Sequence, residues 1–183
     1  MSISVEDLNL VMKEIVYNKD NLLENDITEK VIRVKALLLK NDKLLIGNEN
    51  GVFQFIGGHL EERETIKDCL KREILEETGI EIDDNDIGNS FMKVTYLNKD
   101  WPKPGNNRKC EIYYYVVNTY KDVDLLKTNY TESELDNNFK IEILPLNESI
   151  KIIEENIPNN ELNKVIAPDM ILAINEYLHQ YKN

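Results

Sequence analysis

The chain has 183 residues, a length that suits one domain, spanning residues 1–183, with a substantial hydrophobic core. Its 42% hydrophobic and 31% charged residues are ordinary for a soluble globular protein. The net charge of −12 argues against a general surface for nucleic acids or anionic membranes. It does not exclude anionic nucleotides, because a bound metal ion can invert the charge locally.

The two cysteines, Cys69 and Cys110, are too few and too far apart to predict a disulfide framework or a zinc site. We interpret them as free thiols in a reducing compartment. The sequence shows neither a signal peptide nor a long apolar run. We therefore expect a cytoplasmic protein that has no membrane partner.

The first predicted element is an amphipathic helix over about residues 4–17. Ser4 is its expected cap, and apolar residues recur at helical spacing at Val5, Leu8, Met12 and Ile15. We expect this helix to pack against the domain or to form a homodimer contact, rather than to carry chemistry. The polar residues 18–29 are predicted to form a loop.

Three strands are predicted next. Residues 31–40 (VIRVKALLLK) contain an apolar run that is typical of a strand buried on both faces. Arg33 and Lys35 alternate with its apolar residues and could both project toward a substrate, with exposure to solvent as the alternative. Of the two, Arg33 is the candidate for substrate binding. Shorter strands are predicted at residues 44–47 and 53–56.

A helix is predicted over residues 65–78, which contain neither glycine nor proline. Thr65, with Asp68 three residues later, is typical of a capping box, and Gly79 supplies a C-terminal stop. The apolar stripe of this helix consists of Ile66, Leu70 and Ile74. An acidic face overlaps the stripe and consists of Glu73, Glu76 and Glu77.

Neighbouring carboxylates that are partly buried repel one another unless a cation lies between them. Mg²⁺ is the hard, oxygen-binding cation expected here, with Mn²⁺ as a second choice. The Gly57-Gly58 pair lets the backbone approach closely, so a carbonyl oxygen could serve as a further ligand. Arg72 is the only cation in the acidic cluster, and we expect it to orient Glu64. The alternative is a solvated helix with an ion pair between Asp68 and Arg72.

Two further strands are predicted at residues 91–97 and 109–118. The segment between them contains Trp101 and two prolines, and we expect it to form a rim over the active site. Arg108, at the end of this segment, is available for contacts with phosphate.

The last third of the chain is predicted to hold an acidic loop at 131–136, a strand at 139–146, and helices at 147–156 and 168–181. Three acids in this region are candidates to join the site, and the sequence does not choose among them. They are Glu132, Glu134 and Glu142.

Residues 58–80 have a specific spacing: glycine, five residues, glutamate, seven residues, Arg-Glu, aliphatic, one residue, Glu-Glu, one residue, glycine, aliphatic. The specified positions are Gly58, Glu64, Arg72, Glu73, Ile74, Glu76, Glu77, Gly79 and Ile80. This spacing matches the signature of the Nudix hydrolases at every specified position, so the chain resembles a Nudix hydrolase over these residues.

Strands dispersed among a few helices indicate the α/β class, and the resemblance implies a Nudix-type α/β/α sandwich with a mixed β-sheet. It further implies a Mg²⁺ site formed by Gly58, Glu73, Glu76 and Glu77. Glu76, Glu77 or an acid from the later region would act as general base, with Arg72 and Glu64 in support. Family members often place an aromatic and a polar residue near the substrate at the positions of Phe53 and Gln54. Ile56 departs from the proline that is common before the glycine pair.

The implied reaction is hydrolysis of a diphosphate linkage in a nucleoside diphosphate that carries a further group. A dinucleoside polyphosphate, a nucleotide sugar, ADP-ribose and a nucleoside triphosphate all fit this description. Two alternatives stay open: hydrolysis of the 5′ end of RNA, for which the acidic balance is unfavourable, and a non-catalytic ligand sensor. A sensor would not need the three glutamates, all of which are present.

Overall fold

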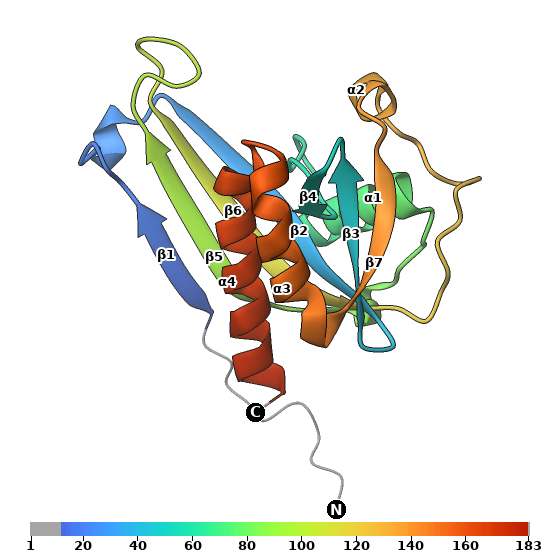
Figure 1. Cartoon of the computed structure of the whole chain (residues 1–183). Helices are drawn as coiled ribbons and strands as arrows, with labels where there is room; N and C mark the ends of the chain where they lie inside the picture. The colour runs from blue at the N-terminus through green and yellow to red at the C-terminus, as the bar shows by residue number, and fades with distance from the viewer. Residues whose placement is uncertain (1–11, 183) are drawn as a thin grey trace, which may run out of the picture.

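The structure is a computed structural model that describes residues 12–182, and its centre is a mixed sheet of seven strands (Figure 1). The strands are β1 (Lys13–Tyr17), β2 (Glu29–Lys40), β3 (Lys43–Glu49), β4 (Val52–Phe55), β5 (Ile87–Asn98), β6 (Arg108–Asn118) and β7 (Lys140–Pro145). Their order is β1-β5-β6-β2-β3-β4, and β7 also pairs with β3. The β1–β5 and β2–β6 pairs are parallel and the others are antiparallel.

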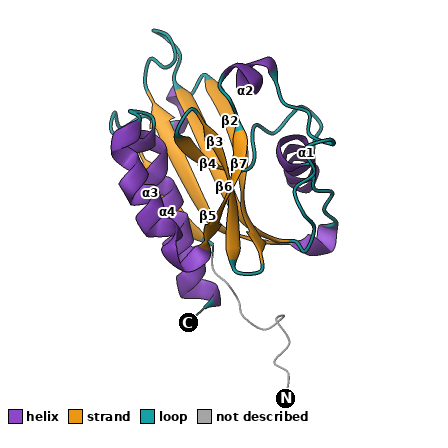
Figure 2. Cartoon of the chain, turned by 45° about the vertical axis from the view of Figure 1, so that its right-hand side comes forward, coloured by secondary structure: helices purple, strands orange, loops and turns teal. Residues whose placement is uncertain are grey.

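Helices cover both faces of the sheet, which confirms the predicted α/β/α sandwich (Figure 2). The helices are α1 (Ile66–Thr78), α2 (Glu132–Asp136), α3 (Leu146–Asn156) and α4 (Asn163–Tyr181), with short 3₁₀ turns at Glu24–Asp26, Asp84–Asp86 and Ile157–Asn159. Helix α1 lies on one face, and α3 and α4 lie side by side on the other. No helix in the part of the chain that the structure describes could cross a membrane.

Strand β2 joins the two hydrophobic cores, because its side chains alternate between them. Val34 and Leu38 are completely buried in the core under α1, whereas Leu37 and Leu39 are buried in the core under α4. The prediction that this strand is buried on both faces is therefore confirmed.

The predicted ends of helix α1 are confirmed as well. The Thr65 hydroxyl accepts a hydrogen bond from the backbone N–H of Asp68, and Gly79 ends the helix in the left-handed conformation. Leu70 and Ile74 are fully buried, and Glu77 lies on the same buried face. The overlap of the acidic face with the apolar stripe thus brings one carboxylate into the interior.

The predicted N-terminal helix is wrong where it can be compared. Residues 4–11 of that prediction lie outside the described residues, and Lys13–Tyr17 form strand β1. The sequence KEIVY has a β-branched and aromatic end, and β5 offers it a free edge for parallel pairing. Tertiary pairing therefore overrides the helical periodicity over these residues, and they do not form the helix from which a homodimer contact was expected.

The largest of the remaining differences from the predictions lie at α2 and α4. The acidic loop expected at 131–136 contains helix α2, which begins at a capping box between Thr131 and Glu134. The last helix begins at Asn163 rather than at Pro168, so the proline lies inside it. Upstream residues extend this helix because Ala167 is buried against the sheet, which offsets the hydrogen bond that Pro168 cannot donate.

Replacing Gly79 with alanine is expected to destabilise the fold more than the same change at Gly51. Both glycines have positive φ, at 70° and 82°, and alanine in this conformation costs about 1–2 kcal/mol. A Cβ atom at Gly79 would lie 1.9 Å from the Asp124 carbonyl oxygen, whereas one at Gly51 would meet nothing within 4 Å. Urea unfolding of the two variants measures the difference. Equal losses of stability would contradict the close packing at Gly79.

Candidate active site

The last turns of α1 line a cavity of about 490 Å³, which we call the acidic cavity. The expected metal ligands Gly58, Glu73, Glu76 and Glu77 all line it. Glu61, in the connection from β4 to α1, and Glu134, on α2, add two further carboxylates. The structure therefore brings the acidic cluster of the Nudix-like segment together with an acid from a distant part of the chain.

Glu77 is the most buried of these acids, with 6% of its surface exposed. Its Oε1 accepts a hydrogen bond from the Gly57 N–H at 3.2 Å, and its Oε2 is buried without a partner among the described residues. Burial raises the pKa of Glu77 to about 8, although the charge of Lys35 acts in the opposite direction. A buried carboxylate oxygen without a partner is costly, so this atom is well placed to bind a cation.

Arg72 connects the other carboxylates. As expected from the sequence, it pairs with Glu64: its Nε and Nη2 donate to Oε1 and Oε2 at 2.8 and 3.0 Å. Its Nη1 donates to Glu73 at 2.7 Å and to Glu76 at 3.3 Å. Arg72 lowers the pKa of Glu64, whereas burial raises the pKa of Glu73. One guanidinium group therefore orients three acids of the segment.

The Gly57-Gly58 backbone lies close to the β2 backbone and to the Glu73 side chain of α1, and Gly57 has no room for a side chain. A Cβ atom at Gly57 would lie 2.2 Å from the Val34 carbonyl oxygen, and one at Gly58 would lie 2.4 Å from Glu73 Oε1. The Gly58 carbonyl, an expected metal ligand, accepts a hydrogen bond from the Val34 N–H at 3.0 Å, which leaves it one lone pair.

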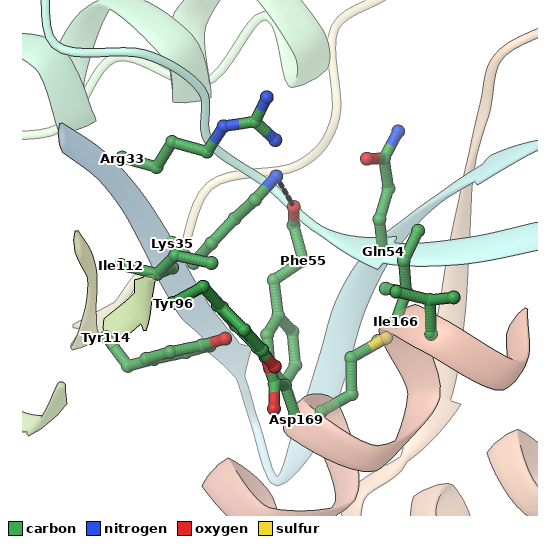
Figure 3. A pocket seen from close by; sticks show the side chains of 11 residues that line it. Arg33, Lys35, Gln54, Phe55, Tyr96, Ile112, Tyr114, Ile166 and Asp169 are labelled. Atoms are coloured by element: carbon green, nitrogen blue, oxygen red, sulfur yellow. Dashed lines mark hydrogen bonds between the residues drawn. The ribbon is translucent and has the colours of Figure 1, made fainter. Parts of the chain in front are cut away.

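Lys35 is a site residue whose role the sequence did not indicate. Its ammonium group is partly buried and donates to the Phe55 carbonyl oxygen at 2.9 Å (Figure 3) and to the Gly57 carbonyl oxygen at 2.5 Å. Burial lowers its pKa, and the nearby Glu77 charge counteracts this shift. Lys35 therefore fixes the chain as it leaves β4 and places a positive charge behind the acidic cavity.

The acidic cavity fits a hard divalent cation. The donors are carboxylate oxygens with a backbone carbonyl nearby, and Glu77 Oε2 is buried and unpaired. Within residues 12–182, no three acidic, histidine or cysteine side chains already converge as a metal cluster. Glu73 and Glu76 accept hydrogen bonds from Arg72. To bind a metal ion, these two side chains would have to give up those hydrogen bonds.

The three candidate acids of the later region lie in different places. Glu134 lines the acidic cavity, and its charge raises the pKa of Glu77. Its Oε2 accepts hydrogen bonds from the Thr131 N–H and hydroxyl at 2.6 and 2.8 Å. Glu132 is exposed on α2, and Glu142 on β7 is bonded to Asn48 and Lys140. Neither of these two lines the cavity.

The four residues predicted to bind substrate also lie in different places. Gln54 lines the acidic cavity, and Arg33 donates from Nε to His59 Nε2 at 3.1 Å beside it. Arg108 lies further away and is held by Glu29 at 2.8 and 3.1 Å. Phe53 is buried in the core under α4, and its neighbour Phe55 lines a cavity in its place. The aromatic ring that lines a cavity therefore lies two residues after the predicted one.

Two further cavities lie beside the acidic cavity. The first, about 200 Å³, is lined by Phe55, Tyr96, Tyr114 and Asp169 among others, and we call it the aromatic cavity (Figure 3). The second, about 740 Å³, is lined by several cationic residues and by Trp101, and we call it the basic groove.

Asp169 is a functional candidate that the sequence interpretation missed. Its Oδ2 accepts a hydrogen bond from the Tyr96 hydroxyl at 2.6 Å. Burial raises the pKa of Asp169, and the hydroxyl groups of Tyr96 and Tyr114 oppose this shift. The signal was available in the sequence, because Asp169 interrupts an otherwise apolar face between Ile166 and Ala173.

The family model of the NUDIX domain matches residues 30–161, which is more than half of the chain. The chain belongs to the Nudix hydrolase family. The match includes the acidic segment of α1, the Gly57-Gly58 pair and the Glu134 region, so the acidic cavity lies within the Nudix domain.

Several known proteins are similar to this Nudix protein. The mRNA-decapping proteins OPG121 of vaccinia virus and D9 of variola virus are 43% identical to it over 44 residues, or 24% of this chain and 21% of each relative. The matched segment thus spans about a fifth of these relatives. Solved structures include the ORF135 protein of E. coli (TM-score 0.48, 17% identity, 67% of this chain and 79% of that chain) and a MutT protein from Bacillus halodurans (0.48, 17%, 66% and 72%).

The affinity of the acidic cavity for divalent metal ions is expected to rise with pH up to about pH 8 and then to level off. Below the pKa of Glu77, which is about 8, a metal ion must displace the proton of this carboxyl group. The affinity should therefore change about tenfold per pH unit in that range. Electron paramagnetic resonance of free Mn²⁺ measures this affinity at each pH. A Glu77→Gln control should bind Mn²⁺ weakly and lose this pH dependence; an unchanged profile would contradict the role of Glu77.

Glu134→Gln is expected to lower kcat about 100-fold, because Glu134 is the later acid that lines the cavity and a general base contributes a factor of this order. Glutamine at this position can keep the capping box of α2, so the fold should be retained. The matched control is Glu132→Gln on the same helix, which should keep normal turnover. Similar rates for the two variants would exclude the general-base role.

Proposed function

We propose that this Nudix protein is a metal-dependent pyrophosphohydrolase that cleaves a diphosphate linkage in a nucleoside diphosphate derivative. The observation that carries this proposal is the buried, unpaired Oε2 atom of Glu77 in a cavity with several further carboxylates. A protein that used these glutamates only as a solvated, salt-bridged surface would not bury one of them without a partner.

Glu73, Glu76 and Glu77 would hold the metal ion, Mg²⁺ or Mn²⁺, with the Gly58 carbonyl as a further possible donor. When bound, such an ion neutralises phosphate charge and lowers the pKa of water. Arg72 keeps Glu64 in place and is available to Glu73 and Glu76 through its Nη1 atom. Lys35 holds the loop that donates the Gly57 N–H to Glu77.

Glu134 is the residue that we propose as general base. The Thr131 N–H and hydroxyl hold its Oε2, which leaves Oε1 to accept a proton from the attacking water. Gln54 and Arg33 lie on the side of the cavity that continues into the aromatic cavity, where they can bind phosphate oxygens.

We further propose the cytoplasm as the compartment of this protein, since Cys69 and Cys110 are free thiols.

A second candidate is hydrolysis at the 5′ end of RNA. The similarity over 44 residues to viral mRNA-decapping proteins favours it. The net charge of −12 favours a small nucleotide instead, because a broad RNA surface would be cationic. The two candidates share the acidic cavity and differ only in what lies beyond the diphosphate.

The test is phosphate release with Mg²⁺ across ADP-ribose, nucleotide sugars, diadenosine polyphosphates, nucleoside triphosphates and 5′-triphosphorylated RNA. We expect turnover of at least one class and a loss of at least about 1000-fold in the Glu77→Gln variant, since this change removes a metal ligand. Circular dichroism and urea unfolding of the variant serve as the folding control. Full activity in Glu77→Gln, or inactivity of the wild type on the whole panel, would refute the proposal.

A further inference from the structure

Helix α2 carries Glu134, the general base of the proposed reaction, but its own apolar contacts are few. The helix has five residues, none of them is buried, and Leu135 is 62% exposed. A helix this short is unstable in water on its own. It stands at the end of the sheet where β3 turns into β4 (Figure 1). Its position must therefore depend on polar contacts and on the chain at its two ends.

The chain is anchored on both sides of α2. The rings of Tyr130 and Phe139 meet edge to face with centroids 5.2 Å apart, and Phe139 is buried in the core under α1. The Phe139 N–H donates to the Glu134 carbonyl oxygen at 2.9 Å. These contacts fix the base of the segment 131–138, which we call the α2 arm. They leave the arm free to tilt about that base.

A chain of side-chain hydrogen bonds joins the α2 arm to the turn between β3 and β4. Asn137 donates from Nδ2 to Glu49 Oε1 at 2.8 Å, and its Oδ1 accepts from Asn50 Nδ2 at 3.3 Å. Asn138 donates from Nδ2 to Asn50 Oδ1 at 3.3 Å. The Glu49 carboxylate can only accept, so it orients the amide of Asn137 and, through it, the other two amides. This hydrogen bond is the shortest of the three and has a charged acceptor, which makes it the strongest.

The β3–β4 turn is a firm support for the arm. The Gly51 carbonyl oxygen accepts from the side chains of Asn156, on α3, and Asn163, on α4, at 2.8 and 3.0 Å. Asn163 is buried and also accepts a hydrogen bond from the Phe53 N–H at 3.2 Å. The turn is thus held by the helices on one face of the sheet, while the arm that it supports reaches the acidic cavity on the other.

We propose that Glu49 and Asn137 are positioning residues that hold Glu134 at the acidic cavity. Glu49 serves two side chains at once, because its Oε2 accepts from Gln54 Nε2 at 3.4 Å while its Oε1 accepts from Asn137. Gln54 and Glu134 both line the acidic cavity. One carboxylate therefore sets the arm that carries the base relative to a side chain on the substrate side. This inference rests on the proposed function and adds the residues that place its general base.

The test exchanges the donor and the acceptor of the Glu49–Asn137 hydrogen bond. Asn137→Asp keeps the shape of the side chain but removes the donor and sets two carboxylates against each other. We expect kcat to fall about tenfold with KM unchanged, because the base is displaced and the substrate contacts are not. Adding Glu49→Gln restores a donor that faces an acceptor, and its carbonyl oxygen can still accept from Gln54. The double variant should therefore recover most of the turnover, measured on the compound of the panel above that the wild type hydrolyses fastest.

Two further readouts separate positioning from general destabilisation. In a Glu134→Gln background, Asn137→Asp should have no further effect on kcat, because the group that it displaces is already inactive. Without any nucleotide, amide hydrogen exchange over residues 131–139 should become about tenfold faster in Asn137→Asp and return to the wild-type rate in the double variant. Asn89→Asp is the matched control, since it adds the same charge at an exposed residue of β5 that lines none of the three cavities.

Wild-type turnover and exchange in Asn137→Asp would overturn the inference. A loss of kcat that Glu49→Gln does not rescue, or that adds to the loss in Glu134→Gln, would overturn it while the pyrophosphohydrolase stands. A wild type that hydrolyses nothing on the panel would refute the proposed function alone. Hydrogen exchange would then decide the inference: faster exchange that the double variant reverses keeps the link between Glu49 and the α2 arm, and unchanged exchange rejects it.

Discussion

The contact that the acidic cavity depends on is the close approach of the Gly57-Gly58 backbone to β2 and α1. At Gly57 only a residue without a Cβ atom allows it, because such an atom would lie 2.2 Å from the Val34 carbonyl oxygen. At Gly58 a Cβ atom would lie 2.4 Å from the Glu73 carboxylate, so that side chain would have to move. The loop in turn donates the Gly57 N–H to Glu77 and is held by Lys35. The hydrogen bond to Glu77 therefore depends on the absence of a side chain at Gly57, and the Glu73 carboxylate occupies the space that a side chain at Gly58 would fill.

The features that could be predicted from the sequence are those determined by nearby residues. Thr65 and Gly79 define the ends of α1 through their own conformations, and the apolar run of β2 indicates burial on both faces. The pairing of Arg72 with Glu64 was predictable from one cation among acids. The α/β/α sandwich was predicted from the resemblance to the Nudix signature, whose spacing covers a loop and the helix that follows it.

The features that could not be predicted depend on contacts between distant segments. Residues 13–17 form a strand because they pair with the edge of β5, some 80 residues later in the chain, although their apolar residues recur at helical spacing. Glu134 was one of three equivalent acids until the fold placed α2 beside the last turn of α1. Asp169 interrupts an apolar helix face in the sequence, but only the fold brings it to Tyr96 on β5, whose hydroxyl donates to it in the aromatic cavity.

Strand β1 has a further consequence for how the molecule opens. It lies at the end of the described sheet, pairs only with β5 over five residues, and is mostly exposed. Such an edge is the part of a sheet that opens at the lowest cost in free energy. Because Tyr17 belongs to β1, local unfolding there removes one wall of the basic groove while the acidic cavity stays intact. Mild heat or denaturant would thus open the groove before it disturbs the carboxylates of the acidic cavity, which no residue of β1 lines.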